Sequence, residues 1–252
     1  MADPYEALAA GYDAVMAHVN YDRWARLVHR LLQRHGTAVQ SLLELAGGTG
    51  SLAVRLQPLG GYRYTLTDGA LAMVRQAAQK VAASNASIRC QRLRFHDLSP
   101  APSALEAPFD AVVLVYDGLN YLRTPAAVAD LLAGVHRVLR PGGLCVLDHA
   151  TPANSEAHAD AFADEGTTDD GFAYVRESRY DPATQQHVTT FTLSVDGTPA
   201  HERHIQRVYA PGTLRNLLEA SPLRIVAAYD GFTDDPAHAS SHRVHWIAQR
   251  PQ

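Results

Sequence analysis

Five short apolar runs alternate with amphipathic stretches over the first 150 residues of the chain. We expect these runs to be strands, at positions 41–46, 62–67, 88–93, 109–116 and 144–148. Most of the stretches between them repeat apolar residues every three or four positions, as one face of a helix does. Strands that alternate with helices form an open parallel sheet with right-handed crossovers, and strands this apolar are buried on both faces. The pattern therefore predicts a doubly wound α/β core.

The period of the apolar residues changes after residue 151. Residues 172–180, 186–195 and 200–209 alternate between apolar and polar side chains, and Asp196-Gly197 is a hairpin turn signal. Such alternation is typical of antiparallel strands. We therefore expect an antiparallel, β-rich cap over residues 153–209, inserted into the core.

The last 40 residues return to the core. A helix is expected at 212–220, followed by two strands at 223–229 and 243–249. Their connection is too short for a helical crossover, so this pair should be antiparallel. The expected fold class is α/β, with a seven-stranded, mostly parallel doubly wound sheet and a β-rich cap insertion. Residues 1–152 and 210–252 would form the core, with the N-terminal helices 1–36 as a lid.

Composition and charge narrow the class of protein. A chain of 252 residues with 46% hydrophobic residues suits one core with a modest insertion. Twenty-two Lys and Arg against 26 Asp and Glu argue against nucleic acid as the main partner. Cys90 and Cys145 lie in apolar runs and are expected to be free, buried thiols. An acidic N-terminus and the lack of an 18-residue apolar run predict a cytoplasmic protein with no membrane partner.

The turn after the first strand carries the clearest functional signal. Its sequence is Ala46 followed by Gly47-Gly48-Thr49-Gly50, and glycines there let the backbone approach a ligand while the next helix offers free N–H groups. The spacing is not the GxGxxG of dinucleotide-binding proteins. Asp68 ends the next strand, where a carboxylate can accept hydrogen bonds from both hydroxyls of a ribose. Together these residues predict an adenosine-type ligand at the carboxyl edge of the sheet.

Four segments resemble the successive motifs of class I S-adenosylmethionine-dependent methyltransferases. They are residues 44–50, Thr67-Asp68 followed by Met73, residues 109–113 and residues 139–143. The resemblance covers the chain from about residue 12 to the end, and the reversed last strand fits it. It implies an enzyme that binds S-adenosyl-L-methionine.

A narrower resemblance is to small-molecule methyltransferases such as the aminosugar N,N-dimethyltransferases. It rests on Gly11-Tyr12-Asp13, on residues 116–122 and on residues 202–209. It implies methyl transfer to an amine or hydroxyl of a small-molecule acceptor, which the cap would cover. The oligomeric state stays open between a monomer and a homodimer.

The resemblance also implies a set of cofactor-binding residues. Glu44, Ala46, Gly47 and Gly48 would line the methionine moiety, Asp68 would take the ribose, and Met73 and Phe95 would flank the adenine; Val115 and Tyr116 would border the sulfonium, and Tyr12 would belong to the lid. Ala46 stands where the family usually has glycine. An Asp that often holds the adenine amino group is displaced here. Either Asp97 replaces it, or Phe95 packs on the adenine while a backbone group reads its edge.

Methyl transfer from a sulfonium is an in-line displacement, so the protein mainly aligns the reactants and excludes water. A general base is needed only if the acceptor arrives protonated. The candidates are Tyr121, His204, Glu202 and Asp117. Glu202, His204 and Gln206 share one face of a strand, which either looks into the cleft or is a solvated face of the cap.

Other classes of function are weaker. The 13 histidines show no spacing typical of a metal site, so no metal is expected. Two rivals stay open. One is a nicotinamide-dependent oxidoreductase on a similar sheet, and the other is a non-catalytic protein that binds S-adenosylmethionine or its product.

Overall fold

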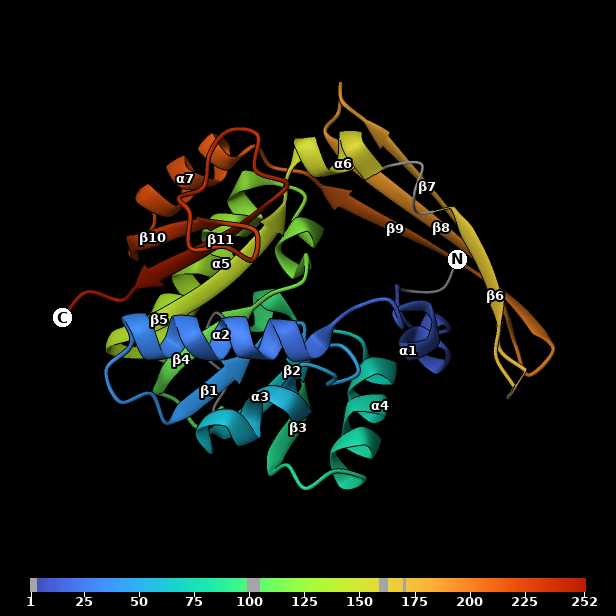
Figure 1. The fold of residues 1–252 in the computed structure, drawn as a ribbon, viewed down its shortest axis with the longest axis horizontal. Helices are drawn as coiled ribbons and strands as arrows, with labels where there is room; N and C mark the ends of the chain where they lie inside the picture. Colours follow the sequence, from blue (N-terminus) through green and yellow to red (C-terminus); the bar gives the residue numbers. More distant parts are fainter. Residues whose placement is uncertain (1–3, 99–104, 159–162, 170) are drawn as a thin grey trace.

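The computed structural model describes residues 4–98, 105–158, 163–169 and 171–252. Seven strands form one sheet in the order β10-β11-β5-β4-β1-β2-β3 (Figure 1). Their bounds are β1 Ser41–Glu44, β2 Arg63–Asp68, β3 Ile88–Arg92, β4 Phe109–Leu114, β5 Leu139–Ala150, β10 Arg224–Asp230 and β11 Arg243–Gln249. Strand β11 runs antiparallel to both of its neighbours, and all other pairs are parallel. The predicted seven-stranded, mostly parallel sheet is confirmed.

Strand β5 begins earlier than the sequence pattern indicates. Residues 140–143, which precede the expected strand at 144–148, are part of β5, because Leu139 already pairs with Phe109 and the register shifts before Ala111. Gly142 absorbs this irregularity with a φ of 75°, which a residue without a side chain adopts at low cost.

Helices cover both faces of this sheet. They are α2 Tyr21–His35, α3 Ala53–Gly60, α4 Leu71–Ala82, α5 Pro125–Val138 and α7 Pro211–Glu219. Side chains of α2 and α3 pack with Leu42, whereas those of α5 and α7 pack with Leu43. Neighbouring residues of β1 thus point into two different apolar layers, as successive residues of a strand must. This two-sided burial explains the uniformly apolar strands.

A second sheet of four antiparallel strands lies beside the core (Figure 1). It contains β6 Asp164–Thr167, β7 Ala173–Asp181, β8 Gln186–Val195 and β9 Thr198–Arg207, and α6 Pro152–His158 leads into it. Asp196 and Gly197 have φ values of 50° and 77°, which fit the expected hairpin turn. The sequence pattern did not indicate β6, whose four residues are Asp, Glu, Gly and Thr. These residues form a strand because they pair with β7, although their composition does not favour one.

The N-terminal segment packs against the second sheet. The 3-10 helix η1 Leu8–Ala10 and helix α1 Tyr12–Val15 contribute Leu8 and Val15 to a small apolar cluster with Phe172, Phe191 and Leu193. Helix α2 instead packs on the core sheet. In the described part of the chain, no helix is both long and apolar enough to span a bilayer.

Candidate active site

The glycine turn places backbone groups at the carboxyl edge of the core sheet. Ala46 and Gly48 have φ values of 51° and 57°, in the left-handed region. Gly47 lies so close to Leu66 that a Cβ atom there would approach its side chain to 2.7 Å. Its N–H donates to Thr67 O at 2.9 Å. The turn is therefore held against β2 by contacts that require glycine at position 47.

Asp68, at the end of β2, is tied to this turn. Its Oδ2 accepts a hydrogen bond from the Gly48 N–H, and its Oδ1 accepts one from the Ala70 N–H, both at 2.9 Å. Burial raises the pKa of Asp68, and the hydrogen bonds from Ala70, Gly48 and Gly69 oppose that shift. Each carboxylate oxygen has further acceptor capacity for a ligand hydroxyl.

Glu44 is a buried carboxyl group at the end of β1. It is 3% exposed, and its Oε2 accepts a hydrogen bond from the Tyr64 hydroxyl at 3.0 Å. Burial raises the pKa of Glu44 to about 8, although the Tyr64 hydrogen bond lowers it. A cationic ligand group beside it would favour the ionised form.

A cavity of about 680 Å³ opens at the ends of β1, β2, β3 and β4. All ten residues expected to bind the cofactor line it, namely Tyr12, Glu44, Ala46, Gly47, Gly48, Asp68, Met73, Phe95, Val115 and Tyr116. Asp97 does not line it. Its Oδ2 accepts from the Arg94 N–H at 3.0 Å, and it pairs with His96. Of the two adenine-binding candidates, the geometry favours Phe95.

A second cavity of about 200 Å³ lies between the core and the second sheet. Its lining is more polar than that of the first cavity, and its polar side chains include Asn120, Asn154, Ser155, Arg176, His187, Thr189, His204, Gln206 and Arg243. Four tyrosines line both cavities: Tyr5, Tyr12, Tyr116 and Tyr121. The two cavities thus meet at a group of tyrosines.

Tyr121, His204 and Glu202, the three residues predicted to be catalytic, are connected in a chain of hydrogen bonds. Tyr121 Oη lies 3.0 Å from His204 Nδ1, and His204 Nε2 lies 3.1 Å from Glu202 Oε2. Tyr121 lines both cavities and His204 lines the second.

Glu202 lines neither cavity. Its carboxylate accepts hydrogen bonds from the N–H groups of Tyr5, Ala7 and Leu8, at 2.8, 2.6 and 3.0 Å. Burial disfavours its ionised form, but the hydrogen bonds from His204 and from these backbone groups outweigh burial and lower its pKa. The strand face that carries Glu202 and His204 is therefore buried rather than solvated.

The loop after β4 is fixed by an ion-pair network of two half-buried charges and one buried charge. Tyr116 and Asp117 both have left-handed backbone conformations, with φ values of 65° and 66°. Arg243, on β11, binds the Asp117 carboxylate and also pairs with Asp148 on β5. Asp117, a candidate base from the sequence, is thus occupied by a guanidinium.

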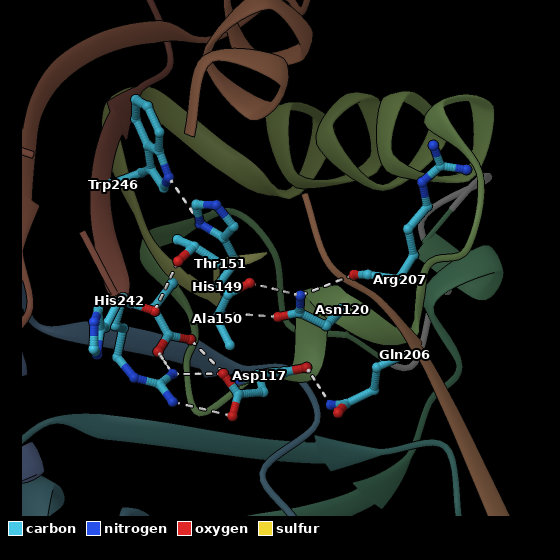
Figure 2. Close-up of polar contacts among 11 residues, drawn as sticks. Asp117, Asn120, His149, Ala150, Thr151, Gln206, Arg207, His242 and Trp246 are labelled. Carbon is cyan, nitrogen blue, oxygen red and sulfur yellow. Dashed lines mark hydrogen bonds and ion pairs between the residues drawn. The ribbon is translucent and has the colours of Figure 1, made fainter. Parts of the chain in front are cut away.

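Asn120 joins this loop to both sheets, as Figure 2 shows. Its side-chain amide donates to Ala150 O and to Arg207 O, at 3.0 and 2.9 Å, while its Oδ1 accepts from the Ala150 N–H. Gln206 donates to Asp117 O from the second sheet. The residues that border the second cavity are therefore held from the core and from β9 together.

Several residues of these cavities were not assigned from the sequence. Tyr5, Tyr21 and Trp24 line the first cavity, and Asn120 and Arg176 line the second. Trp24 packs edge-on against Tyr116, with ring centroids 5.5 Å apart. Among the described residues, no group of three or more His, Cys, Asp or Glu side chains is arranged to hold a metal ion. Cys90 and Cys145 are free.

Comparison with known proteins finds a family model and curated relatives that this chain resembles. A family model described as a methyltransferase domain matches residues 42–143. The putative methyltransferase YqeM of Bacillus subtilis (strain 168) is 29% identical over 98% of this chain and 97% of its own length.

Solved structures share the fold. A S-adenosylmethionine-dependent methyltransferase from Clostridium acetobutylicum ATCC 824 superposes with a TM-score of 0.77 at 19% identity, covering 99% of this chain and 100% of that one. An amino pentose methyltransferase from Micromonospora echinaspora, solved with S-adenosylmethionine bound, has a TM-score of 0.67 at 18% identity, covering 99% and 98%.

Proposed function

We propose that this chain is a class I S-adenosylmethionine-dependent methyltransferase, and that it transfers the methyl group to an amine of a small polar molecule held between the two sheets. The observation that carries the proposal is the meeting of two cavities at four tyrosines. One cavity is lined by the residues expected to bind the cofactor. The other has a larger share of polar groups in its lining and suits a separate acceptor.

The residues of the first cavity fit the cofactor in chemistry. Glu44 would pair with the ammonium group of the methionine moiety, and Asp68 would accept hydrogen bonds from the ribose hydroxyls. Met73 and Phe95 would flank the adenine, while Val115 and Tyr116 would lie beside the sulfonium. When bound, S-adenosylmethionine supplies the electrophilic methyl group. The protein's own contribution is to align this group with the acceptor and to exclude water.

The second cavity favours a compact acceptor. Its volume of about 200 Å³ is below the roughly 300–1,000 Å³ typical of sites for drug-sized ligands. Tyrosine ring faces attract cations, so four tyrosines at the junction favour a sulfonium on one side and an ammonium on the other. The side-chain amides and hydroxyl groups of the second cavity suit an acceptor with several polar groups. The likeness to an amino pentose methyltransferase is consistent with this chemistry.

His204 can take up a proton from such an acceptor through Tyr121. His204 Nδ1, 3.0 Å from Tyr121 Oη, is the base, and the Tyr121 hydroxyl connects it to the cavity junction. Glu202 holds the imidazole in the orientation that leaves Nδ1 free to accept. A hydroxyl acceptor would use the same groups.

The cofactor part of the proposal is tested by calorimetry with S-adenosylmethionine and S-adenosylhomocysteine. We expect dissociation constants on the order of micromolar, which correspond to binding free energies of roughly −7 to −8 kcal/mol. Asp68→Asn should weaken both at least about tenfold, because it weakens charge-assisted hydrogen bonds. Asp22→Asn, at an exposed carboxylate on α2, should leave binding unchanged. Binding of a nicotinamide nucleotide instead would refute the assignment.

The acceptor part is tested by incubating the enzyme with S-adenosylmethionine and a panel of small amines and alcohols, including amino sugars. Methylated products are then measured by mass spectrometry. We expect methylation of amines, and methylation of alcohols alone would show that the acceptor class is wrong.

A further inference from the structure

Tyr5 has no role in the sequence motifs, yet its ring lies at the junction of the two cavities. Its hydroxyl is 2.5 Å from Tyr121 Oη, and its ring centroid is 4.6 Å from that of His204. Tyr5 has a φ of 71°, a left-handed conformation that costs a non-glycine residue on the order of 1–3 kcal/mol. Surrounding contacts must therefore hold it there.

Glu202, the last residue of this hydrogen-bonded series, determines the direction of each hydrogen bond in it. Glu202 already accepts from three backbone N–H groups and is ionised, so it can only accept from His204 Nε2. The neutral imidazole then carries its proton on Nε2, and Nδ1 accepts from the Tyr121 hydroxyl. Because Tyr121 donates to His204, it must accept from Tyr5. The oxygen of Tyr5 retains a lone pair for a further donor.

We propose that Tyr5 is a catalytic residue, the group that receives the proton of the acceptor's ammonium. The inference rests on the proposed function. The ammonium N–H bond breaks and its proton goes to Tyr5 Oη, the Tyr5 proton goes to Tyr121 Oη, and the Tyr121 proton goes to His204 Nδ1. The products are a neutral amine and an imidazolium whose Nε2–H donates to Glu202. One positive charge moves from the acceptor to His204, and no other reactant is consumed.

Two anchors bring Tyr5 to this position. Glu202, on β9, binds the backbone of residues 5–8 and so acts as a positioning residue. On the other side, Asp13 of α1 pairs with Lys80 of α4 at 2.6 Å and accepts from Thr49 of the glycine turn. The N-terminal segment is thus tied to the second sheet and to the core, and its position over the cavities completes the proton path.

The first experiment needs no acceptor. Sinefungin carries an amine-bearing carbon in place of the methylated sulfur of the cofactor, whereas S-adenosylhomocysteine has no group there. Binding of both is measured by calorimetry at pH 7 for the wild type, Tyr5→Phe and Tyr229→Phe. The control residue Tyr229 also hydrogen-bonds a histidine, His35 at 2.9 Å, but lies outside both cavities.

We expect Tyr5→Phe to weaken the binding of sinefungin by about tenfold, because the substitution removes a hydrogen-bond acceptor for the charged amine of sinefungin. S-adenosylhomocysteine should bind within about twofold of the wild type, and Tyr229→Phe should change neither. If sinefungin loses no more affinity than S-adenosylhomocysteine, the proposal is wrong. If the wild type binds neither compound, the proposed function itself fails.

The second experiment is the pH dependence of the rate with the panel amine that is methylated fastest. Tyr5→Phe should lower kcat at pH 7 by about 100-fold, a typical contribution of a positioned proton acceptor. This loss of kcat should become smaller as the pH rises toward the pKa of the free amine, because more of the acceptor then arrives neutral. Glu202→Gln should show the same trend, because it releases both the segment and the imidazole. A loss that is equal at every pH would mean that Tyr5 is structural only.

Discussion

Arg243 and Asp117 form a bidentate ion pair, with Nη1–Oδ1 and Nη2–Oδ2 distances of 2.6 and 3.1 Å, across the carboxyl edge of the core sheet. Arg243 comes from the reversed strand β11, and Asp117 follows Tyr116 in the loop that borders both cavities. The guanidinium also lies over the Trp24 and Tyr116 rings, at 5.2 and 5.7 Å from their centroids. The reversed strand therefore shapes the place where cofactor and acceptor are proposed to meet.

Arg243→Met should strongly destabilise the protein. It leaves Asp148, which is fully buried, without its cation, and breaking such a pair typically costs about 3–5 kcal/mol. Burial already raises the pKa of Asp148, and losing Arg243 raises it further. Because the folded-state pKa lies above the unfolded value, the extra loss of stability should grow as pH rises. Urea unfolding of the wild type and the variant at pH 5 and pH 8 measures this loss of stability.

The matched control is Arg215→Met, which removes an exposed i,i+4 pair with Glu219. Such pairs contribute only about 0.3–0.5 kcal/mol. The double variant Arg243→Met/Asp148→Asn should recover part of the lost stability. Equal unfolding midpoints for the two arginine variants would show that the Arg243 pair does not stabilise the loop.

Asn120→Ala should loosen the connection between the two sheets. The side chain is 1% exposed and satisfies Ala150 O, Ala150 N–H and Arg207 O. Each buried polar group left unsatisfied costs about 1–3 kcal/mol, so we expect a loss of about 3 kcal/mol in total. Asn120→Asp should be worse, because a carboxylate would face two carbonyl oxygens. Thermal unfolding of both variants decides this, and a larger loss for alanine than for aspartate would contradict the assignment.

The core could be predicted from the sequence because its signals are local. Apolar runs such as 109–113 and the glycine turn after β1 report burial and backbone conformation through neighbouring residues alone. Asp68 could be placed for the same reason, since the end of a strand and the start of a helix determine it.

The contacts that complete the candidate site are not local. Glu202 binds the backbone of Tyr5 from 197 positions away, and no pattern within either segment indicates the contact. Alternation did predict that Glu202 and His204 share a strand face, but not that residues 5–8 cover it. Strand β6 and helix α6 also lack a strong apolar period, so only their packing defines them.

Cofactor binding should depend on pH through Glu44. Burial raises the pKa of this carboxyl from 4.5 to about 8 in the free protein. An ammonium group prefers the ionised form, so binding of S-adenosylhomocysteine should release a proton and strengthen as pH rises from 6 toward about 8. Calorimetry in two buffers with different ionisation enthalpies measures the released proton. Glu44→Gln should bind more weakly and show little of this dependence.

The same group affects folding in the opposite direction. Since the folded state of the free protein holds the Glu44 proton more tightly than the unfolded state, its contribution to stability falls as pH rises from about 4.5 to about 8. Glu44→Gln cannot ionise, so its unfolding free energy should fall less over this range. A slope as steep as that of the wild type would mean that other carboxyl groups, such as Asp68 and Asp148, determine it.

Ala46→Gly should stabilise the protein. Ala46 has a φ of 51°, and the left-handed region costs an L-residue with a side chain about 1–2 kcal/mol. Glycine avoids this cost but loses about 0.5–1 kcal/mol of chain entropy on folding, so the net gain should be about 0.5–1 kcal/mol. For a chain of 252 residues that corresponds to an increase in Tm of roughly 1–4 °C. Ala78→Gly, at an exposed position in the interior of α4, is the matched control and should lower stability by about 1 kcal/mol. If both glycine variants lower the Tm, the left-handed conformation of Ala46 is not strained, because the turn compensates for it.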